Sequence, residues 1–282
     1  MSQSNVLHNS FIIPLEENLF IRGDVEVAVG GDKKPVVILC HGFKGFKDWG
    51  FFPHTSNVLA EKGFAVIRFN FSCSGVNNTD FDELEKFSIN TYSREQADLQ
   101  ALLNTLTTTT ELPFTEHMDL SQIFLLGHSR GGGDSILFAA ESSQIKGVIS
   151  WNGISQVDIF DQSLKQQIKK AGIGFIENKR TKQQMPIRSI VLEDIKQNKE
   201  RFDILSHLQH LQVPALFIQG AEDASRLIEG FHQMERTAPN QVFVQIDGAN
   251  HTFGAVHPFK GTTPFLEQAI NYTIHFLQQH TK

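Results

Sequence analysis

Short apolar runs alternate with stretches of helical periodicity along most of this chain. Six segments have the length and composition of strands: 35–40, 64–70, 123–126, 147–151, 214–220 and 241–247. Helical patterns lie between or after several of them, including 53–62 and 266–277. Strands that alternate with helices predict a mostly parallel sheet with helices on both faces, joined by right-handed crossovers.

The first hundred residues contain a second kind of pattern. Residues 10–13 and 18–22 flank a polar turn and predict an antiparallel hairpin, and the alternation at 25–29 predicts a further edge strand. Residues 72–90 are polar and acidic, which predicts a surface loop with little structure. Ser93–Gln96 has the sequence of a capping box and is followed by leucines at helical spacing, so a helix is expected to begin there.

Residues 154–208 interrupt this alternation. They are rich in glutamine and lysine, and their apolar residues recur irregularly at helix-like intervals. Because no repeat and no linker composition is visible, we interpret residues 1–282 as a single α/β domain with a helical cap inserted at about 154–208.

Composition narrows the possible partners and location. The chain has 282 residues, about 40% of them hydrophobic, so it can bury a sizeable core without disulfides or metals. A net charge of −6 disfavours nucleic-acid binding. The two cysteines cannot form a disulfide framework and have no metal-ligand spacing; Cys40, within a strand pattern, is expected to be buried. Neither a signal peptide nor a membrane span is apparent, so we expect a cytoplasmic protein without a membrane partner.

The run at 123–126 leads directly into Gly127-His128-Ser129-Arg130-Gly131, and small and apolar residues follow. A Gly-x-Ser-x-Gly sequence between a strand and a helix is typical of a nucleophile elbow. In such an elbow the serine lies on a strained turn, and the flanking glycines allow strand and helix to approach closely. The N–H groups at the start of the helix then face any negative charge that develops nearby.

Two further strand ends supply matching side chains. Asp223 follows the strand that ends at Gly220, and His251 follows the strand that ends at Asp247. Because the carboxyl ends of parallel strands meet at one edge of a sheet, we expect both residues beside Ser129. His251 would accept the serine proton, and Asp223 would orient the histidine ring.

Other residues are candidates for the roles of the acid and the histidine. Glu222 is the nearest rival to Asp223, and His257, which we interpret as structural, is the nearest rival to His251. Asp194 and Asp203 lie inside the expected cap and are weaker candidates.

Supporting groups are expected around the serine. The backbone N–H groups of Phe43 and Arg130 would form an oxyanion hole. His41 is interpreted as a residue that orients the loop containing Gly42, and the Arg130 side chain is expected to pair with a carboxylate below the elbow.

These motifs resemble those of the α/β-hydrolase superfamily. His41-Gly42-Phe43 is similar to its oxyanion loop, Gly127–Gly131 to its elbow, and 220–223 and 250–251 to its acid and histidine motifs. Within the superfamily the chain resembles bacterial cinnamoyl/feruloyl-type esterases, dienelactone-hydrolase-like proteins and serine aminopeptidases. Serine in place of the cysteine of dienelactone hydrolase argues against that reaction, and it also excludes the aspartate chemistry of haloalkane dehalogenases.

The resemblance and the residues together imply a serine hydrolase. We expect it to cleave carboxylic esters through an acyl-enzyme intermediate, with a small-molecule ester or a short peptide as substrate and no metal or cofactor. An aminopeptidase is the main alternative, and it would need a carboxylate for the substrate ammonium; the acidic loop contains Asp80, Asp82, Glu83 and Glu85. A thioesterase and a non-catalytic binding module are further alternatives. The sequence does not predict the acyl group, the leaving group or the oligomeric state.

Two features bear on the substrate pocket. Five aromatic residues near the oxyanion loop would either wall the pocket or pack in the core: Phe43, Phe46, Trp49, Phe51 and Phe52. Residues 165–188 carry seven basic side chains against one acidic side chain, Glu177. This segment is interpreted as a solvated surface, with attraction of an anionic substrate as the alternative.

Overall fold

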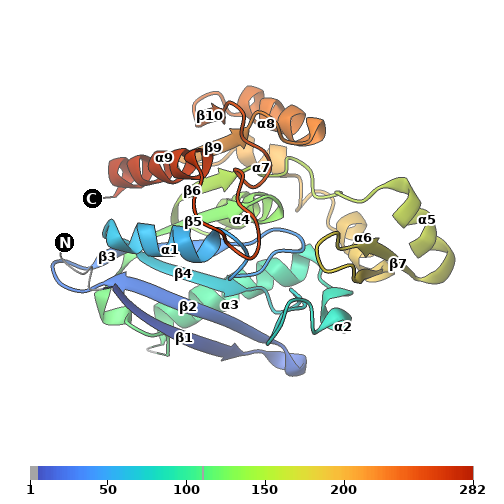
Figure 1. Ribbon diagram of the computed structural model, residues 1–282, viewed down its shortest axis with the longest axis horizontal. Coiled ribbons are helices and arrows are strands. Elements are labelled where there is room, and N and C mark those ends of the chain that lie inside the picture. The colour runs from blue at the N-terminus through green and yellow to red at the C-terminus, as the bar shows by residue number, and fades with distance from the viewer. Residues whose placement is uncertain (1–5, 110, 282) are drawn as a thin grey trace.

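The computed structural model describes residues 6–109 and 111–281, and within them eight strands form one sheet (Figure 1). Residues 1–5, on which the expectation of no signal peptide partly rests, lie outside the described residues. The strands are β1 (Val6–Pro14), β2 (Phe20–Ala28), β3 (Lys34–Cys40), β4 (Ala65–Asn70), β5 (Met118–His128), β6 (Ile145–Trp151), β9 (Ala215–Gly220) and β10 (Val242–Ile246). Their order is β1-β2-β4-β3-β5-β6-β9-β10, and every pair from β4 to β10 is parallel. The predicted mostly parallel sheet is confirmed.

Alternate side chains of the central strands serve the two faces of the sheet, as the period of a strand requires. In β3, Val36, Ile38 and Cys40 enter one apolar cluster, which also takes side chains from α3 (Tyr92–Thr108), α4 (Arg130–Glu141) and α8 (Ser225–Thr237). Val37 and Leu39 enter the opposite cluster, formed with α1 (Phe52–Glu61) and α9 (Pro264–His280). Strands covered on both faces explain the continuous apolar runs in the sequence. No helix of the described residues is long and apolar enough to cross a membrane.

The prediction of a separate edge strand at 25–29 is wrong. Residues 25–28 continue β2, which pairs antiparallel with β1 on one side and with β4 on the other. Asp24 and Glu26 of this strand are buried and form ion pairs: Arg68 of β4 lies 3.0 Å from Asp24 and 3.3 Å from Glu26. The alternation of apolar and charged residues in β2 arises from buried ion pairs and does not indicate a strand edge that faces solvent. A short 3₁₀ helix, η1 (Glu16–Asn18), joins β1 to β2, and a second, η2 (Thr115–His117), precedes β5.

The segment 154–208 contains three helices and a β-hairpin, so the expectation of a purely helical cap is wrong in this respect. The helices are α5 (Gln162–Ala171), α6 (Ser189–Gln197) and α7 (Ile204–Gln209), and the hairpin is β7 (Ile173–Glu177) with β8 (Gln184–Arg188). Gly172, at φ 74°, ends α5 in the left-handed conformation and turns the chain into β7. Figure 1 shows α5, α6 and β7 at one end of the molecule, on the right of the view and away from α9.

The prediction of a surface loop with little structure at 72–90 is wrong about burial, because part of this segment lies in the interior. The segment includes α2 (Leu84–Phe87), and its residues Val76, Phe81 and Phe87 form a third apolar cluster with cap residues such as Met185. Acidic side chains surround these apolar residues in the sequence, so the average composition of the segment is polar although part of it is buried. The helix that follows also begins differently from the capping-box prediction: Thr91 is the N-cap of α3 and accepts a hydrogen bond from Arg94 N at 3.1 Å.

Candidate active site

Ser129 lies at the turn between β5 and α4 with φ 57° and ψ −117°, a conformation that non-glycine residues rarely adopt. A Cβ atom on Gly127 would lie 2.0 Å from the Gly131 carbonyl oxygen, and one on Gly131 would lie 2.3 Å from the Cys40 carbonyl oxygen. Only glycine fits at either position. Close approach of β5, α4 and β3 therefore accounts for both flanking glycines of the motif.

His251 and Asp223 come together at the ends of β10 and β9. Nδ1 of His251 lies 2.8 Å from Oδ2 of Asp223, a hydrogen bond in which the ring nitrogen donates to the carboxylate. The same carboxylate accepts from Ala224 N at 2.7 Å and from Gln219 Nε2 at 3.0 Å. Burial acts to raise the pKa of Asp223, but the contacts with His251 and the other hydrogen bonds outweigh it and lower that pKa below its usual value. Glu222, the rival acid, is exposed.

The backbone of His251 is held by two residues that sequence reasoning did not single out. The carbonyl oxygen of His251 accepts from His128 Nε2 at 2.8 Å and from Asn152 Nδ2 at 2.9 Å. Burial, followed by the neighbouring His251, lowers the pKa of His128 to about 3. His128 is therefore neutral at ordinary pH and donates through Nε2. In the sequence, only their positions distinguish His128 and Asn152: His128 directly precedes the serine, and Asn152 directly follows β6.

The loop after β3 lies against the elbow. A Cβ atom on Gly42 would lie 3.0 Å from Cβ of Ser129 and 2.9 Å from the His128 carbonyl oxygen. His41 orients this loop, because its Nδ1 contacts the Gly42 carbonyl oxygen at 3.0 Å and its Nε2 accepts from Phe71 N at 3.3 Å. Burial lowers the pKa of His41, so the ring is neutral. Within residues 6–109 and 111–281, the N–H groups of Phe43 and Arg130 donate no hydrogen bond.

A buried ion pair lies below the elbow. The Arg130 guanidinium donates to Glu95 of α3 at 2.7 Å and stacks 3.8 Å from the ring centroid of Tyr92. This contact confirms the predicted pairing of Arg130 with a carboxylate. Burial and the nearby Glu95 raise the pKa of Asp134, one turn further along α4. The ion pair joins α3 to the first turn of α4, and this turn fixes the position of Ser129.

Ser129 and His251 line the same cavity of about 440 Å³. Its walls come from the loop 42–45, Trp49, Phe52, the elbow, Thr252 and residues 176–180 at the end of the cap hairpin. Phe43, Trp49 and Phe52 thus face the cavity, whereas Phe46 and Phe51 are buried in the apolar clusters. In the described part of the chain no hydrogen bond joins the Ser129 hydroxyl to His251; such contacts are commonly loose before substrate binds.

The remaining candidate residues lie elsewhere. Asp194 accepts from Ser93 N at 3.1 Å, and Asp203 caps α7. His257 accepts from Gly50 N at 2.9 Å, a structural contact. Asp80 pairs with Arg180 of the cap at 2.6 Å, Asp82 accepts from three N–H groups of its own loop, and Glu83 and Glu85 pair with Lys86 and Arg188. The described residues contain no group of three or more His, Cys, Asp or Glu side chains arranged to hold a metal ion.

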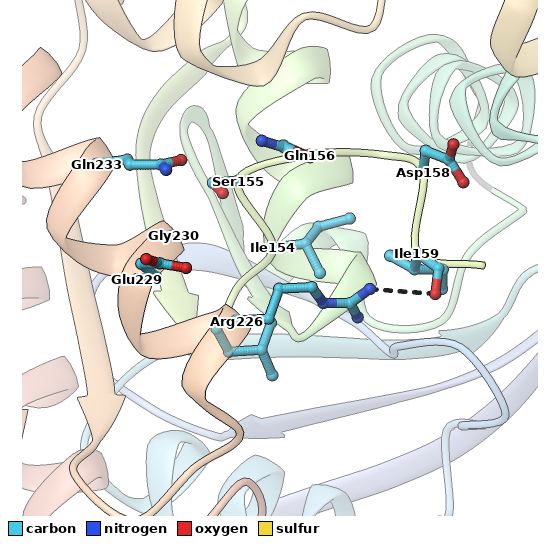
Figure 2. A pocket seen from close by; sticks show the side chains of 10 residues that line it. Ile154, Ser155, Gln156, Asp158, Ile159, Arg226, Glu229, Gly230 and Gln233 are labelled. Atoms are coloured by element: carbon cyan, nitrogen blue, oxygen red, sulfur yellow. Dashed lines mark hydrogen bonds between the residues drawn. The ribbon is translucent and has the colours of Figure 1, made fainter. Parts of the chain in front are cut away.

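A smaller cavity of about 210 Å³ lies between the start of the cap and α8 (Figure 2). Arg226 of α8 extends across it and donates to the Ile159 carbonyl oxygen at 3.2 Å. None of the proposed site residues lines this cavity.

Comparisons with known proteins agree with the fold. Residues 31–190 match the family described as "Serine aminopeptidase, S33". Dienelactone hydrolase from Anabaena variabilis is similar in structure, with a TM-score of 0.66, 16% identity and coverage of 99% of this chain and 100% of that chain. Est1E from Butyrivibrio proteoclasticus, solved with bound ferulic acid, has a TM-score of 0.70, 17% identity and coverage of 94% and 96% of the two chains.

One curated relative, from Escherichia coli, is described as "Uncharacterized 31.7 kDa protein in traX-finO intergenic region". It is 28% identical over 133 residues, which is 47% of this chain and 42% of the relative. The match therefore spans less than half of this relative's length.

The sheet, its two helical layers and the elbow define an α/β-hydrolase. More specifically, the chain belongs to the serine aminopeptidase family, because the match at residues 31–190 covers more than half of its length.

Proposed function

We propose that this hydrolase is a serine enzyme that cleaves carboxylic esters through an acyl-enzyme intermediate. One observation carries the proposal: the His251 ring, hydrogen-bonded to Asp223 at 2.8 Å, lines the same cavity as Ser129 at the elbow. Residues 154–208 would act as the cap of a single catalytic domain, and the reaction would require no metal or cofactor.

In the first half-reaction Ser129 Oγ attacks the ester carbonyl carbon while Nε2 of His251 accepts the hydroxyl proton. Asp223 holds Nδ1 and stabilises the imidazolium that forms. The negatively charged tetrahedral oxygen accepts hydrogen bonds from the backbone N–H groups of Phe43 and Arg130. His251 then returns its proton to the departing alcohol. In the second half-reaction water attacks the acyl-enzyme, again with His251 as base, and the carboxylic acid leaves.

Several observations favour an ester over an N-terminal peptide. An aminopeptidase needs a carboxylate for the substrate ammonium. None of the four acidic residues at 80–85 lines the cavity, and each already has an ion-pair or hydrogen-bond partner. Glu177 is the one acidic residue among the described cavity-lining residues, and its carboxylate lies 3.4 Å from Lys182. Aromatic walls from Phe43, Trp49 and Phe52 suit an apolar acyl or alcohol group.

The test compares p-nitrophenyl esters, thioesters and aminoacyl p-nitroanilides with the wild type and the Ser129→Ala variant. We expect the wild type to favour esters, and the variant to lose roughly 10³-fold or more in kcat, because only the oxyanion donors and binding remain. Ser143→Ala, an exposed serine after α4, is the matched control and should retain full activity.

A fluorophosphonate probe gives an independent readout, because it labels an activated serine covalently. It should label the wild type and the Ser143→Ala control but not Ser129→Ala. Absence of labelling in folded wild type would support a non-catalytic binding module instead. Faster turnover of aminoacyl anilides than of esters would support the aminopeptidase.

A further inference from the structure

Two lysine residues from different parts of the chain line the cavity of Ser129. Lys44 follows Phe43 in the loop after β3, and Lys179 lies in the turn between β7 and β8 of the cap. The catalytic body and the cap therefore each place one ammonium group at the same cavity.

The other charged residues of this cavity have ion-pair partners, whereas these two lysines have none among the described residues; Lys44 Nζ lies 5.9 Å from the centroid of the Phe43 ring. Arg180 lies 2.6 Å from Asp80, and Glu177 lies 3.4 Å from Lys182. Among the described residues, no carboxylate lies within the 4.0 Å ion-pair distance of Lys44 or Lys179. The cavity is thus lined by two ammonium groups, one half-buried and one exposed, that have no ion-pair partner in the described part of the chain.

Lys44 is held in place at a cost. Its φ of 58° is unusual for a residue with a side chain, and the turn is closed by the hydrogen bond from Gly45 N to the Gly42 carbonyl oxygen at 2.9 Å. Burial, followed by repulsion from Lys179, lowers the pKa of Lys44. An anion between the two lysines would offset the repulsion and restore the solvation that burial removes.

We propose that Lys44 and Lys179 bind a carboxylate carried by the ester substrate, an inference that rests on the proposed esterase function. The apolar walls of the cavity, Phe43, Trp49, Phe52 and Ile176, would contact the chain that joins this carboxylate to the ester bond. Apolar neighbours solvate a doubly charged group poorly, which favours a singly charged carboxylate over a phosphate. The substrate class is therefore an ester with a carboxylate at the far end of an apolar chain.

The test measures kcat/KM for the p-nitrophenyl monoesters of adipic and suberic acid and for their methyl-capped, neutral counterparts. The reacting bond and the chain are matched within each pair, so the preference for the anionic member isolates recognition of the carboxylate. We expect the wild type to prefer the anionic member by roughly tenfold at low salt, because hydrogen bonds to a charged group are stronger than those to a neutral one and are screened least at low salt. The preference should fall as ionic strength rises.

Three variants locate the effect. Lys44→Gln and Lys179→Gln should each reduce the preference for the anionic ester by several-fold, and Lys179→Arg should restore most of it. Lys170→Gln is the matched control: Lys170 lies on α5 of the same cap and is exposed, but it does not line the cavity. Retention of the preference in this control separates a local contact from the general positive field of the cap. Thermal unfolding of each variant establishes that it is folded.

Two results overturn the inference alone: equal kcat/KM for both members of each pair with a flat salt response, or a preference that persists in both glutamine variants of the cavity. In either case hydrolysis that depends on Ser129 would still stand. Failure of every ester together with failure of fluorophosphonate labelling would overturn the proposed function, and this inference with it.

Discussion

His251 is positioned through both its ring and its backbone. Asp223 accepts from the ring at 2.8 Å, while His128 and Asn152 donate to the carbonyl oxygen of the same residue. The His251 ring is half-exposed at the cavity, so packing alone does not fix its orientation. These hydrogen bonds restrict it instead. His128 is the more unusual of the two donors, since a buried histidine must remain neutral to donate without an added charge.

His128 should make the fold sensitive to acid. The folded state holds its pKa near 3, whereas the unfolded state has a value near 6.5, so below pH 6.5 the unfolded chain binds a proton that the folded chain does not. The free energy of unfolding should therefore fall as pH decreases through this window, by at most about 1.4 kcal/mol per pH unit from this group. In His128→Gln the amide can still donate to the His251 carbonyl oxygen but cannot titrate.

The measurement is thermal unfolding of the wild type and His128→Gln between pH 7 and pH 4. We expect the difference in Tm between the two proteins to shift in favour of the variant as pH decreases. His232→Gln is the control and should follow the wild type, because the side chain of His232 on α8 is 43% exposed. Parallel curves for wild type and His128→Gln would contradict the buried, neutral state of His128.

Residues of the site differ in how far the sequence could identify them. Ser129, Asp223 and His251 each follow a strand, so topology alone places them at one edge of the sheet. His128 and Asn152 act on a backbone carbonyl that is 123 and 99 residues away in the chain. No local pattern encodes such a contact, and for that reason sequence reasoning did not identify them.

At the scale of elements, the elbow depends on the distance between β5, α4 and the loop after β3. The glycines at 127 and 131 are positions where backbone meets backbone, so a side chain there cannot turn away. The ion pair of Arg130 with Glu95 ties α3 to the same helix start. Any displacement of α4 would also move Ser129 and the Arg130 N–H.

Gly127→Ala should therefore damage both stability and activity. Its Cβ would lie 2.0 Å from the Gly131 carbonyl oxygen, which forces a backbone shift. Overpacking of this kind costs typically about 1–3 kcal/mol, and a displaced nucleophile of about 1 Å can cost 10²-fold in rate. Urea unfolding and kcat/KM for a p-nitrophenyl ester measure the two effects.

Gly30→Ala serves as the comparison for this prediction. Gly30 has φ 91° and no atom within 4 Å of the added methyl group, so the variant introduces backbone strain without a clash. It should lose about 1–2 kcal/mol and keep its kcat/KM, because it is distant from the elbow. An equal loss of activity in both variants would argue that strain rather than the close approach of strand and helix matters.

The strands of the sheet could be predicted because burial on both faces makes them continuously apolar. The hairpin β7–β8 could not. Each of its strands has only five residues, and their burial comes from the third apolar cluster, whose other members lie in 46–87 and elsewhere in the cap. The same cluster explains why residues 72–90, acidic on average, are partly buried. Apolar residues that pack across a long sequence separation leave no periodic pattern.

Considered as a whole, the molecule consists of a sheet core and a cap that meet above the cavity. The third apolar cluster joins them through Phe87, Phe160 and Met185, and Arg188 N donates to the Ser88 carbonyl oxygen at 2.9 Å. The turn of the hairpin reaches further, over the cavity, and is tied to the body by the ion pair of Arg180 with Asp80. His257 lies 3.4 Å from the same carboxylate.

This ion pair should control the position of the hairpin turn more than the stability of the protein. Both side chains are about one-third exposed, at 33% and 30%, so the pair is expected to contribute at most about 1 kcal/mol to the free energy of unfolding. The free energy of local opening can change more than the free energy of global unfolding, because the turn at 178–183 makes few other contacts with the rest of the protein. In Asp80→Asn we expect little change in Tm, faster amide exchange in residues 173–188, and a lower kcat/KM for esters as one wall of the cavity moves.

Glu85→Gln is the matched comparison, because it removes the partner of Arg188 at the other end of the same hairpin, where Glu85 is 85% exposed and the backbone bond to Ser88 remains. It should leave both exchange and kinetics close to those of the wild type. If Asp80→Asn instead keeps full protection and full activity, the turn is held by the apolar cluster and by the hydrogen bond that Gln183 Nε2 donates to the Phe81 carbonyl oxygen at 3.1 Å. Loss of kcat/KM without faster exchange would mean that Asp80 acts on the charge of the cavity, through Arg180, rather than on the position of its wall.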